Sequence, residues 1–191
     1  MIPTNAPFLV IDVQRAFDHL SWGKRNNLEA ENNIVSLIDL WRKTDRPIIY
    51  VRHISNEKTS LFYMHSITSN FKEMIIPNAN ETVIHKKVNS AFIGTNLEEI
   101  LRGMRCTKIV VTGLTTNHCV ETTTRMAGNL GFNPILVSDA TATFDRKGVN
   151  GEMYDAETIH QMSLANLNGE FAEIMDTKTI LELLVKSEVK Q

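Results

Sequence analysis

The chain has 191 residues, enough for one domain with a full hydrophobic core. Its 20 basic and 22 acidic residues nearly balance and form no run of one sign, which argues against a nucleic-acid or membrane-surface role. The first residues lack the pattern of a signal peptide, and no apolar stretch has the length of a membrane span. We therefore expect a single domain over residues 1–191, a cytoplasmic location, and neither nucleic acid nor membrane as partner.

The first half of the chain predicts two buried strands and one helix. Short apolar runs predict strands at 8–11 and 47–51, and apolar residues at helical spacing predict a helix at 27–42. Residues 54–80 have no clear period but carry several aromatic side chains. Because so long a loop in a compact domain is usually functional, we expect 54–80 to form a folded lid or an interface arm.

The second half continues the alternation of strands and helices. Strands are predicted at 82–85, 108–112, 134–138 and, more weakly, 171–175; helices at 95–104, 121–130, 152–167 and 178–185. Thr95 and Glu98 have the spacing of a capping box at a helix start, and Gly131 suits the left-handed position that ends a helix.

This alternation predicts an α/β fold, a doubly wound, six-stranded and mostly parallel sheet with helices on both faces. The ligand crevice of such a sheet lies at the carboxyl ends of its strands. Asp12, Lys86 and the turn before Cys119 each follow or end a predicted strand. We therefore expect these three distant segments to meet at one edge of the sheet.

Cys119 lies where a strand and a short polar turn give way to a helix. Unpaired N–H groups and the dipole of a helix N-terminus stabilise an anion, so the sequence predicts a thiolate near neutral pH. Lowering a thiol pKa from about 8.5 to about 6 requires about 3.4 kcal/mol, whereas a helix end supplies at most about 2 kcal/mol. A cation is needed as well. Most free cysteines are buried and structural, and we interpret Cys106 in that way.

Lys86 is the candidate cation, and Asp12 the candidate carboxylate. Asp12 would accept the thiol proton and return it to a leaving amine, while pairing with Lys86. Backbone N–H groups of Thr115 and Cys119 are candidate oxyanion donors. Lys87 competes with Lys86, but adjacent strand side chains face opposite ways, so only one of the two enters the site.

Together these motifs resemble the isochorismatase-like cysteine hydrolases over about residues 8–175. The resemblance rests on Asp12-Val13-Gln14, Lys86 four residues before Ser90-Ala91-Phe92, Gly94-Thr95, Gly113-Leu114-Thr115-Thr116-Asn117-His118-Cys119-Val120, and Ser138-Asp139-Ala140. It implies the doubly wound fold, a homo-oligomer (dimer or tetramer), and hydrolysis of C–N bonds by an Asp–Lys–Cys triad. It also selects Lys86 over Lys87 and implies a cis peptide bond before Thr115 that directs backbone N–H groups into the pocket.

Two features of the sequence narrow the range of activities that the resemblance implies. Nicotinamidases of this family have an Asp-x-His metal motif after the second strand, whereas this chain reads Tyr50-Val51-Arg52-His53 there. We therefore expect no metal and no other cofactor. Isochorismatases that cleave a vinyl ether do not need the cysteine, so the presence of Cys119 favours amide-type hydrolysis.

Five further residues are candidates for substrate binding, each with a structural alternative. Trp22 and Phe92 would wall the pocket or cover the core, and His53 would line the pocket or be structural. Gln14 would orient Lys86 or the substrate. His118 suggests a Cys–His pair, but neighbouring residues in a turn rarely direct their side chains at each other, so we do not expect it to be the base for Cys119.

The sequence thus predicts a metal-independent cysteine hydrolase that acts on a small amide, ureido or related C–N substrate through a thioester on Cys119. One alternative is vinyl-ether hydrolysis of the isochorismatase type, which would use Asp12 without the thiol. Another is a non-catalytic binding or scaffold protein with the same fold. A redox sensor is disfavoured, because no resolving cysteine is evident. The sequence does not name the substrate.

Overall fold

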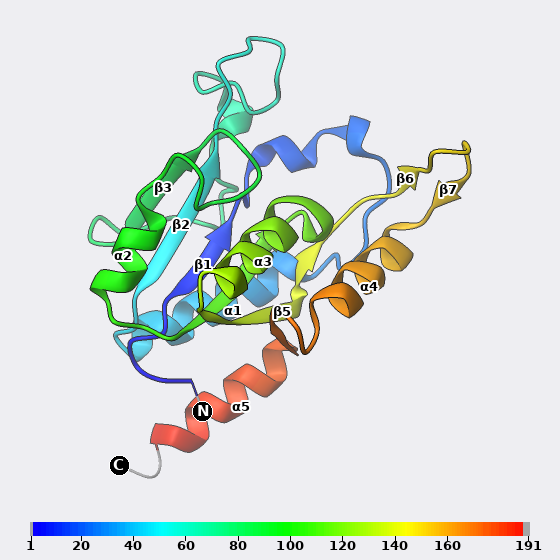
Figure 1. Ribbon diagram of the computed structural model, residues 1–191. Helices are drawn as coiled ribbons and strands as arrows, with labels where there is room; N and C mark the ends of the chain where they lie inside the picture. The colour runs from blue at the N-terminus through cyan, green and yellow to red at the C-terminus, as the bar shows by residue number, and fades with distance from the viewer. Residues whose placement is uncertain (1, 189–191) are drawn as a thin grey trace.

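The computed structural model describes residues 2–188, and its centre is a six-stranded parallel sheet (Figure 1). The strand order is β3-β2-β1-β4-β5-β8, and every neighbouring pair is parallel. The strands are β1 (Phe8–Ile11), β2 (Ile48–His53), β3 (Thr82–Lys86), β4 (Lys108–Leu114), β5 (Asn133–Ala142) and β8 (Glu173–Met175). The six predicted strands and the doubly wound α/β fold are confirmed.

Helices cover both faces of the sheet, and the central strands β1 and β4 are buried along almost their whole length as a result. One core contains residues of α1 (Ala30–Lys43) and α5 (Thr177–Glu188). The other contains residues of α2 (Leu97–Gly103), α3 (Glu121–Asn129) and α4 (Ala156–Leu167). The chain order reverses between β1 and β4, which is where a ligand crevice is expected in such a sheet. None of the described helices could cross a membrane.

The helix prediction at 152–167 is wrong at its start. Residues 153–154 form β7 (Met153–Tyr154), which pairs antiparallel with β6 (Arg146–Lys147). Asp155 then caps α4 by accepting a hydrogen bond from the Thr158 N–H at 2.7 Å. The hairpin of β6 and β7 extends from the body of the molecule (Figure 1). Two-residue strands give too short a pattern to distinguish from the first turn of a helix.

The predicted capping box before α2 is wrong. The helix begins at Leu97 with Asn96 as its N-cap, so Thr95 lies one residue too early. Thr95 Oγ1 accepts from the Leu97 N–H at 3.2 Å, which is a local turn and not an N-cap bond. Glu98 instead pairs with Arg102, one turn further along the helix, at 2.7 Å. The prediction for Gly131 is confirmed, since its φ is 85° directly after α3.

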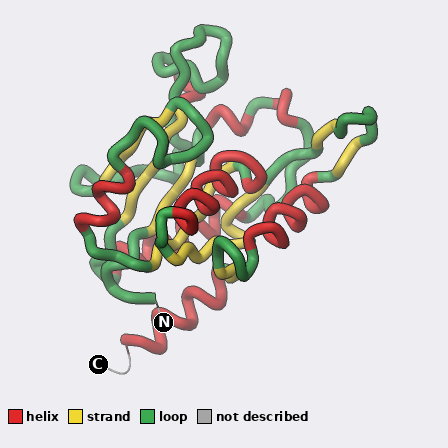
Figure 2. Tube along the Cα trace, in the orientation of Figure 1, coloured by secondary structure: helices red, strands yellow, loops and turns green. Residues whose placement is uncertain are grey.

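The long segment 54–80 is folded although it has almost no regular structure. It contains a short 3-10 turn (Ile67–Ser69) and bridges from Ser55 to Tyr63 and from Phe71 to Gln14. Its first part forms the looped projection at the top of Figure 2, beyond the carboxyl ends of the strands, and its last residues return toward the start of β3. The prediction that this segment folds is therefore confirmed.

The carboxyl edge of β1 and β4 has an unusual backbone. Asp12 has a φ of 52°, a left-handed conformation that Asp and Asn tolerate better than most residues. Gly113 has a φ of 123°, and a Cβ there would collide with the backbone carbonyl of Ile11 in the neighbouring strand. Only glycine lets β4 pass so close to β1, which places the turn before Cys119 beside Asp12.

We predict that Gly113→Ala destabilises the fold by at least about 4 kcal/mol, since backbone atoms must move. Gly131→Ala is the matched control, because Gly131 also has a positive φ (85°) but has no atom within 4 Å of the added Cβ. It should cost only about 1–2 kcal/mol. Urea unfolding of the two variants measures the difference, and equal losses would contradict the proposed collision.

Candidate active site

A buried ion pair lies at the carboxyl edge of the sheet. Lys86 Nζ is 2.6 Å from Asp12 Oδ2, and the two side chains are 0% and 1% exposed. The ammonium also lies 3.0 Å from His53 Nδ1 and donates to the Val88 carbonyl at 3.2 Å. These three contacts account for the three N–H donors of a lysine. Lys87 is exposed, so the selection of Lys86 over Lys87 agrees with the structure.

His53 is neutral in this arrangement. A lysine ammonium only donates, so Nδ1 of His53 must accept, and the ring proton lies on Nε2. Burial and the adjacent Lys86 charge lower the pKa of His53 to about 4. The ring also lines the cavity over Cys119, which agrees with the sequence interpretation of His53 as a pocket residue.

Cys119 joins this group from the other side of β1. The turn before it forms one π-helical turn (Thr116–Val120) that runs directly into α3, so the thiol lies in the first turn of a helix as expected. Cys119 Sγ, a carboxylate oxygen of Asp12 and a ring nitrogen of His53 all lie within 4.8 Å of one another. The structure thus brings together the three predicted catalytic side chains.

The prediction of a thiolate at neutral pH is wrong for this structure. Burial, with the Asp12 carboxylate as the second cause, raises the pKa of Cys119 to about 12, and the Lys86 charge only partly opposes this. The sequence argument counted the helix end and a cation, but omitted the cost of enclosing the sulfur and of placing a carboxylate beside it. The resting form is therefore the thiol.

Asp12 is placed to accept the thiol proton. Burial raises the pKa of Asp12, and the charge of the adjacent Lys86 opposes this rise. The contact with Lys86 is close but poorly directed, because neither Asp12 oxygen has a partner with full hydrogen-bond geometry. A carboxylate held mainly by charge keeps lone pairs available for a proton.

Asp12, His53 and Cys119 also have the spacing of a metal site, and their donor atoms lie within 4.8 Å of one another. The Lys86 ammonium, however, already contacts Asp12 at 2.6 Å and His53 at 3.0 Å. A divalent cation among these donors would be repelled by that charge at close range. The residues present therefore fit an ammonium better than a metal.

A cavity of about 230 Å³ opens over Cys119. Its apolar wall is formed by Phe17, Trp22 and Phe62, whose rings lie 5.1 to 6.5 Å apart. Trp22 donates its indole N–H to the Ala16 carbonyl at 2.9 Å, which fixes the ring. The prediction that Trp22 walls the pocket agrees with this position. Phe62 comes from segment 54–80, so this part of the segment covers the cavity, as a lid would.

Two predicted substrate-binding residues do not reach the cavity. Gln14 is fully buried, and its amide bonds the main chain of His53 and the Ser69 carbonyl, so it holds the end of β2 instead. Phe92 packs against Phe132 at 6.3 Å in the core beneath α2. Both predictions of substrate contact are therefore wrong. Proximity in sequence to Asp12 or Lys86 does not determine the direction of a side chain.

Sequence reasoning also missed three cavity-lining residues, Phe17, Phe62 and Asn89. Phe62 was one of several aromatic residues in an irregular segment, and nothing marked it among them. Phe17 follows β1 in a 3-10 turn (Arg15–Asp18) that has no clear sequence pattern. Asn89 follows Lys86 closely, and that proximity was the only signal available for it.

His118 lines the cavity but does not serve Cys119. Its Nδ1 lies 3.1 Å from Thr115 Oγ1, and its Nε2 lies 2.8 Å from an Arg146 nitrogen. Arg146 can only donate, so Nε2 accepts and Nδ1–H donates to Thr115. Burial and the Arg146 charge lower the pKa of His118. The structure therefore agrees with excluding His118 as the thiol base.

The peptide bond between Leu114 and Thr115 is cis, as the family resemblance implies. Thr115 and Cys119, which follow that bond in the chain, both line the cavity. Their backbone N–H groups remain the predicted oxyanion donors.

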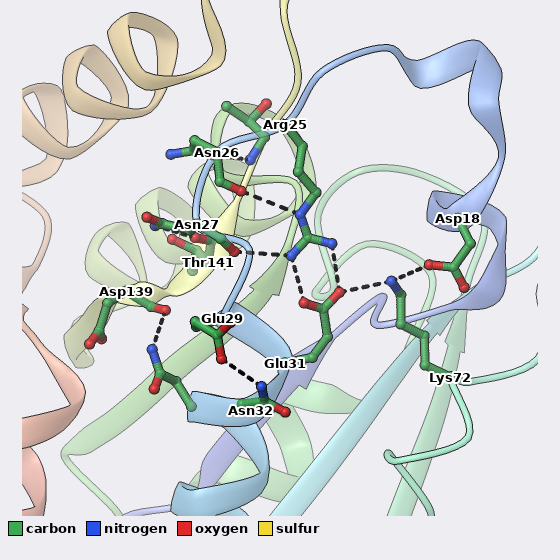
Figure 3. Close-up of polar contacts among 12 residues, drawn as sticks. Asp18, Arg25, Asn26, Asn27, Glu29, Glu31, Asn32, Lys72, Asp139 and Thr141 are labelled. Atoms are coloured by element: carbon green, nitrogen blue, oxygen red, sulfur yellow. Dashed lines mark hydrogen bonds and ion pairs between the residues drawn. The ribbon is translucent and has the colours of Figure 1, made fainter.

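The segment that carries Trp22 is fixed by a network of charged side chains, shown in Figure 3. Arg25 makes two parallel hydrogen bonds to Glu31 of α1, at 2.7 and 2.6 Å. Lys72 bridges Glu31, at 2.8 Å, and Asp18. Segment 15–28 is thereby tied to α1 at one end and to segment 54–80 at the other.

The chain is similar to one known family. The isochorismatase domain model matches residues 7–179. The isochorismatase family protein YrdC of Bacillus subtilis (strain 168) is 49% identical, over 94% of this chain and 96% of that protein. An N-carbamoylsarcosine amidase of Arthrobacter sp. is 33% identical, over 59% of this chain and 38% of that protein. A crystal structure from this family, from Chromobacterium violaceum ATCC 12472, has a TM-score of 0.95 and 41% identity, covering 97% of this chain and 96% of that one.

We predict that iodoacetamide alkylates Cys119 slowly at pH 7 and faster only above pH 9, because burial and Asp12 raise the thiol pKa to about 12. Asp12→Asn should react faster at every pH below that value, since it removes the carboxylate and leaves the Lys86 charge. Peptide mass mapping separates Cys119 from Cys106. A wild-type midpoint below 8 would show that the resting thiol is already ionised.

We also predict that Glu31→Gln lowers the free energy of unfolding by about 3 kcal/mol at pH 7, because two buried cations lose their carboxylate. Burial opposes ionisation of Glu31, but Arg25 and Lys72 lower its pKa to about 2. The contribution of this carboxylate is therefore complete above its ordinary pKa and lost as the pH falls toward 2. Asp18→Asn, with a side chain 59% exposed, should cost less than about 1 kcal/mol. Urea unfolding that gave similar losses for both variants would contradict the network.

Proposed function

The chain belongs to the isochorismatase family, and on that premise we propose that it hydrolyses a small amide, ureido or related C–N substrate through a thioester on Cys119. Members of this family are hydrolases, and some of them are amidohydrolases. The observation that carries the proposal is a thiol and a carboxylate that line one cavity, with an ammonium buried against the carboxylate.

The proposed first step forms the thioester. Cys119 Sγ attacks the substrate carbonyl carbon while Asp12 takes the thiol proton. The carbonyl oxygen gains negative charge in the tetrahedral intermediate, and the N–H groups of Thr115 and Cys119 are the donors proposed to stabilise it. Asp12 then returns the proton to the leaving nitrogen, the C–N bond breaks, and ammonia or an amine departs.

The second step releases the product. Asp12 removes a proton from a water molecule as its oxygen attacks the thioester carbonyl. The C–S bond breaks, and the sulfur recovers a proton from Asp12. Each step leaves Asp12 ionised and paired with Lys86, so the site returns to its starting charge.

The raised thiol pKa determines the timing of proton transfer. A sulfur with a pKa of about 12 is not a nucleophile at rest, so proton transfer must accompany attack. Lys86 supports this step because its charge opposes the rise in the pKa of Asp12 that burial causes, and so favours the carboxylate that must accept the proton. A substrate carbonyl enclosed by Phe17, Trp22 and Phe62 would meet the sulfur in a site largely free of water.

Vinyl-ether hydrolysis is the second candidate, because burial raises the pKa of Asp12 and a protonated Asp12 could donate to an enol ether. The adjacent thiol favours the amide reaction, since a vinyl-ether reaction would leave Cys119 without a role.

We predict that Cys119→Ala abolishes amide turnover, by at least about 10³-fold, while its unfolding curve stays close to wild type. Cys106→Ala is the matched control and should retain activity, because Cys106 is buried in the core outside the cavity. The measurements are turnover of a panel of small amides and mass detection of an acyl adduct on Cys119. Undiminished turnover by Cys119→Ala would refute the covalent route, and vinyl-ether turnover by that variant would support the second candidate.

A further inference from the structure

A second cavity adjoins the cavity over the thiol. It has a volume of about 340 Å³, and Trp22, Thr115 and His118 line both cavities. The additional lining of this outer cavity includes Phe144 and the cations Arg146 and Lys147 of β6. A molecule with its carbonyl at Cys119 would therefore extend toward the base of the β6–β7 hairpin.

The outer cavity carries net positive charge, because its lining includes the two cations Arg146 and Lys147 and one carboxylate, Asp145. No carboxylate among the described residues forms an ion pair with Arg146 or Lys147. Asp145 lines the same cavity, but its Oδ1 accepts the Ala156 N–H at 2.8 Å, at the N-terminus of α4. A carboxylate is stabilised there by the helix dipole and is already engaged.

Arg146 is oriented by the thiol cavity itself. Its guanidinium is 2.8 Å from His118 Nε2, and the other nitrogen of that ring is 3.1 Å from Thr115 Oγ1. The imidazole ring of His118 thus connects Arg146 to Thr115, which lines the same cavity as Cys119. The guanidinium keeps other N–H groups free to bind an anion in the planar, two-pronged manner typical of arginine.

The wall between the two ends is apolar. Trp22 stacks on Phe144 at 5.5 Å, and both rings line the outer cavity. Apolar walls with a few placed polar groups are typical of small-molecule sites. A short hydrocarbon spacer would fit against this wall better than a polar chain.

We propose that the substrate is a short amide with a carboxylate at its other end, and that Arg146 binds this carboxylate in the outer cavity. The proposal rests on the proposed function for the position of the amide. It assigns to Arg146 the choice between anionic and neutral amides, with Lys147 adding to the attraction at longer range.

The test is binding to Cys119→Ala, which has no thiol and cannot form the thioester. Calorimetric titration compares succinamate, an amide with one carboxylate, with succinamide, its neutral counterpart. Malonamate and glutaramate, each with its diamide, vary the spacer by one carbon in either direction. We expect the acid to bind about tenfold more tightly than the diamide for at least one spacer, and the preference to shrink as salt rises.

Arg146→Gln in the same background keeps an N–H donor for His118 but removes the charge, and should abolish the preference. Arg146→Lys should keep part of it. Lys178→Ala, which removes an exposed cation of α5 outside both cavities, should leave it unchanged. Equal binding of acid and diamide at all three spacers, including no binding of either, would overturn the proposal. So would a preference that survives Arg146→Gln.

These outcomes are independent of the covalent mechanism. A preference that depends on Arg146, together with undiminished turnover by Cys119→Ala, would refute the thioester and leave the anion site standing. Loss of turnover in Cys119→Ala, together with equal binding of acid and diamide, would support the thioester and refute the anion site.

Discussion

The buried pair of Asp12 and Lys86 is the constraint on which the rest of the site depends. Both side chains are almost fully enclosed, and two isolated charges in such surroundings would be very costly. The ammonium tolerates burial because His53 Nδ1 and the Val88 carbonyl accept hydrogen bonds from its remaining N–H groups. His53 in turn must be neutral, and Gln14 holds its main chain in place. The ion pair therefore fixes the protonation state of His53, and Gln14 fixes the end of β2 that carries this histidine.

The same pair explains why a thiol with a raised pKa still suits a hydrolase. A carboxylate beside a thiol opposes its ionisation, yet that carboxylate is also the group that can take the proton during attack. The charge of Lys86, 2.6 Å from Asp12, limits the free-energy cost of burying that carboxylate. The site is neutral overall at rest, and the proposed mechanism moves a proton over a short distance without separating charges through an apolar cavity.

The walls of the two cavities come from segments with little regular structure. Phe62 extends from segment 54–80, Trp22 from segment 15–28, and Arg146 from a two-stranded hairpin. The sheet presents the reacting groups, while these loops determine what reaches them. The charge network around Glu31 ties one of these loops, segment 15–28, to α1. The proposed function would thus place the chemistry at the edge of the sheet and the choice of substrate in the loops.

The sequence alone determined the six parallel strands and the meeting of Asp12, Lys86 and Cys119, because apolar runs that end in polar residues place those residues at one edge of a parallel sheet. It did not determine the thiol pKa, which depends on how closely rings from distant segments enclose the sulfur. It also failed for Gln14 and Phe92, whose side-chain directions are set by neighbours far away in the chain. It failed for residues 153–154 because their pairing with 146–147 is too short to leave a pattern. The positions of the strands follow from local hydrophobic pattern, whereas burial and side-chain direction are properties of the packed molecule, and only the tertiary structure decided them.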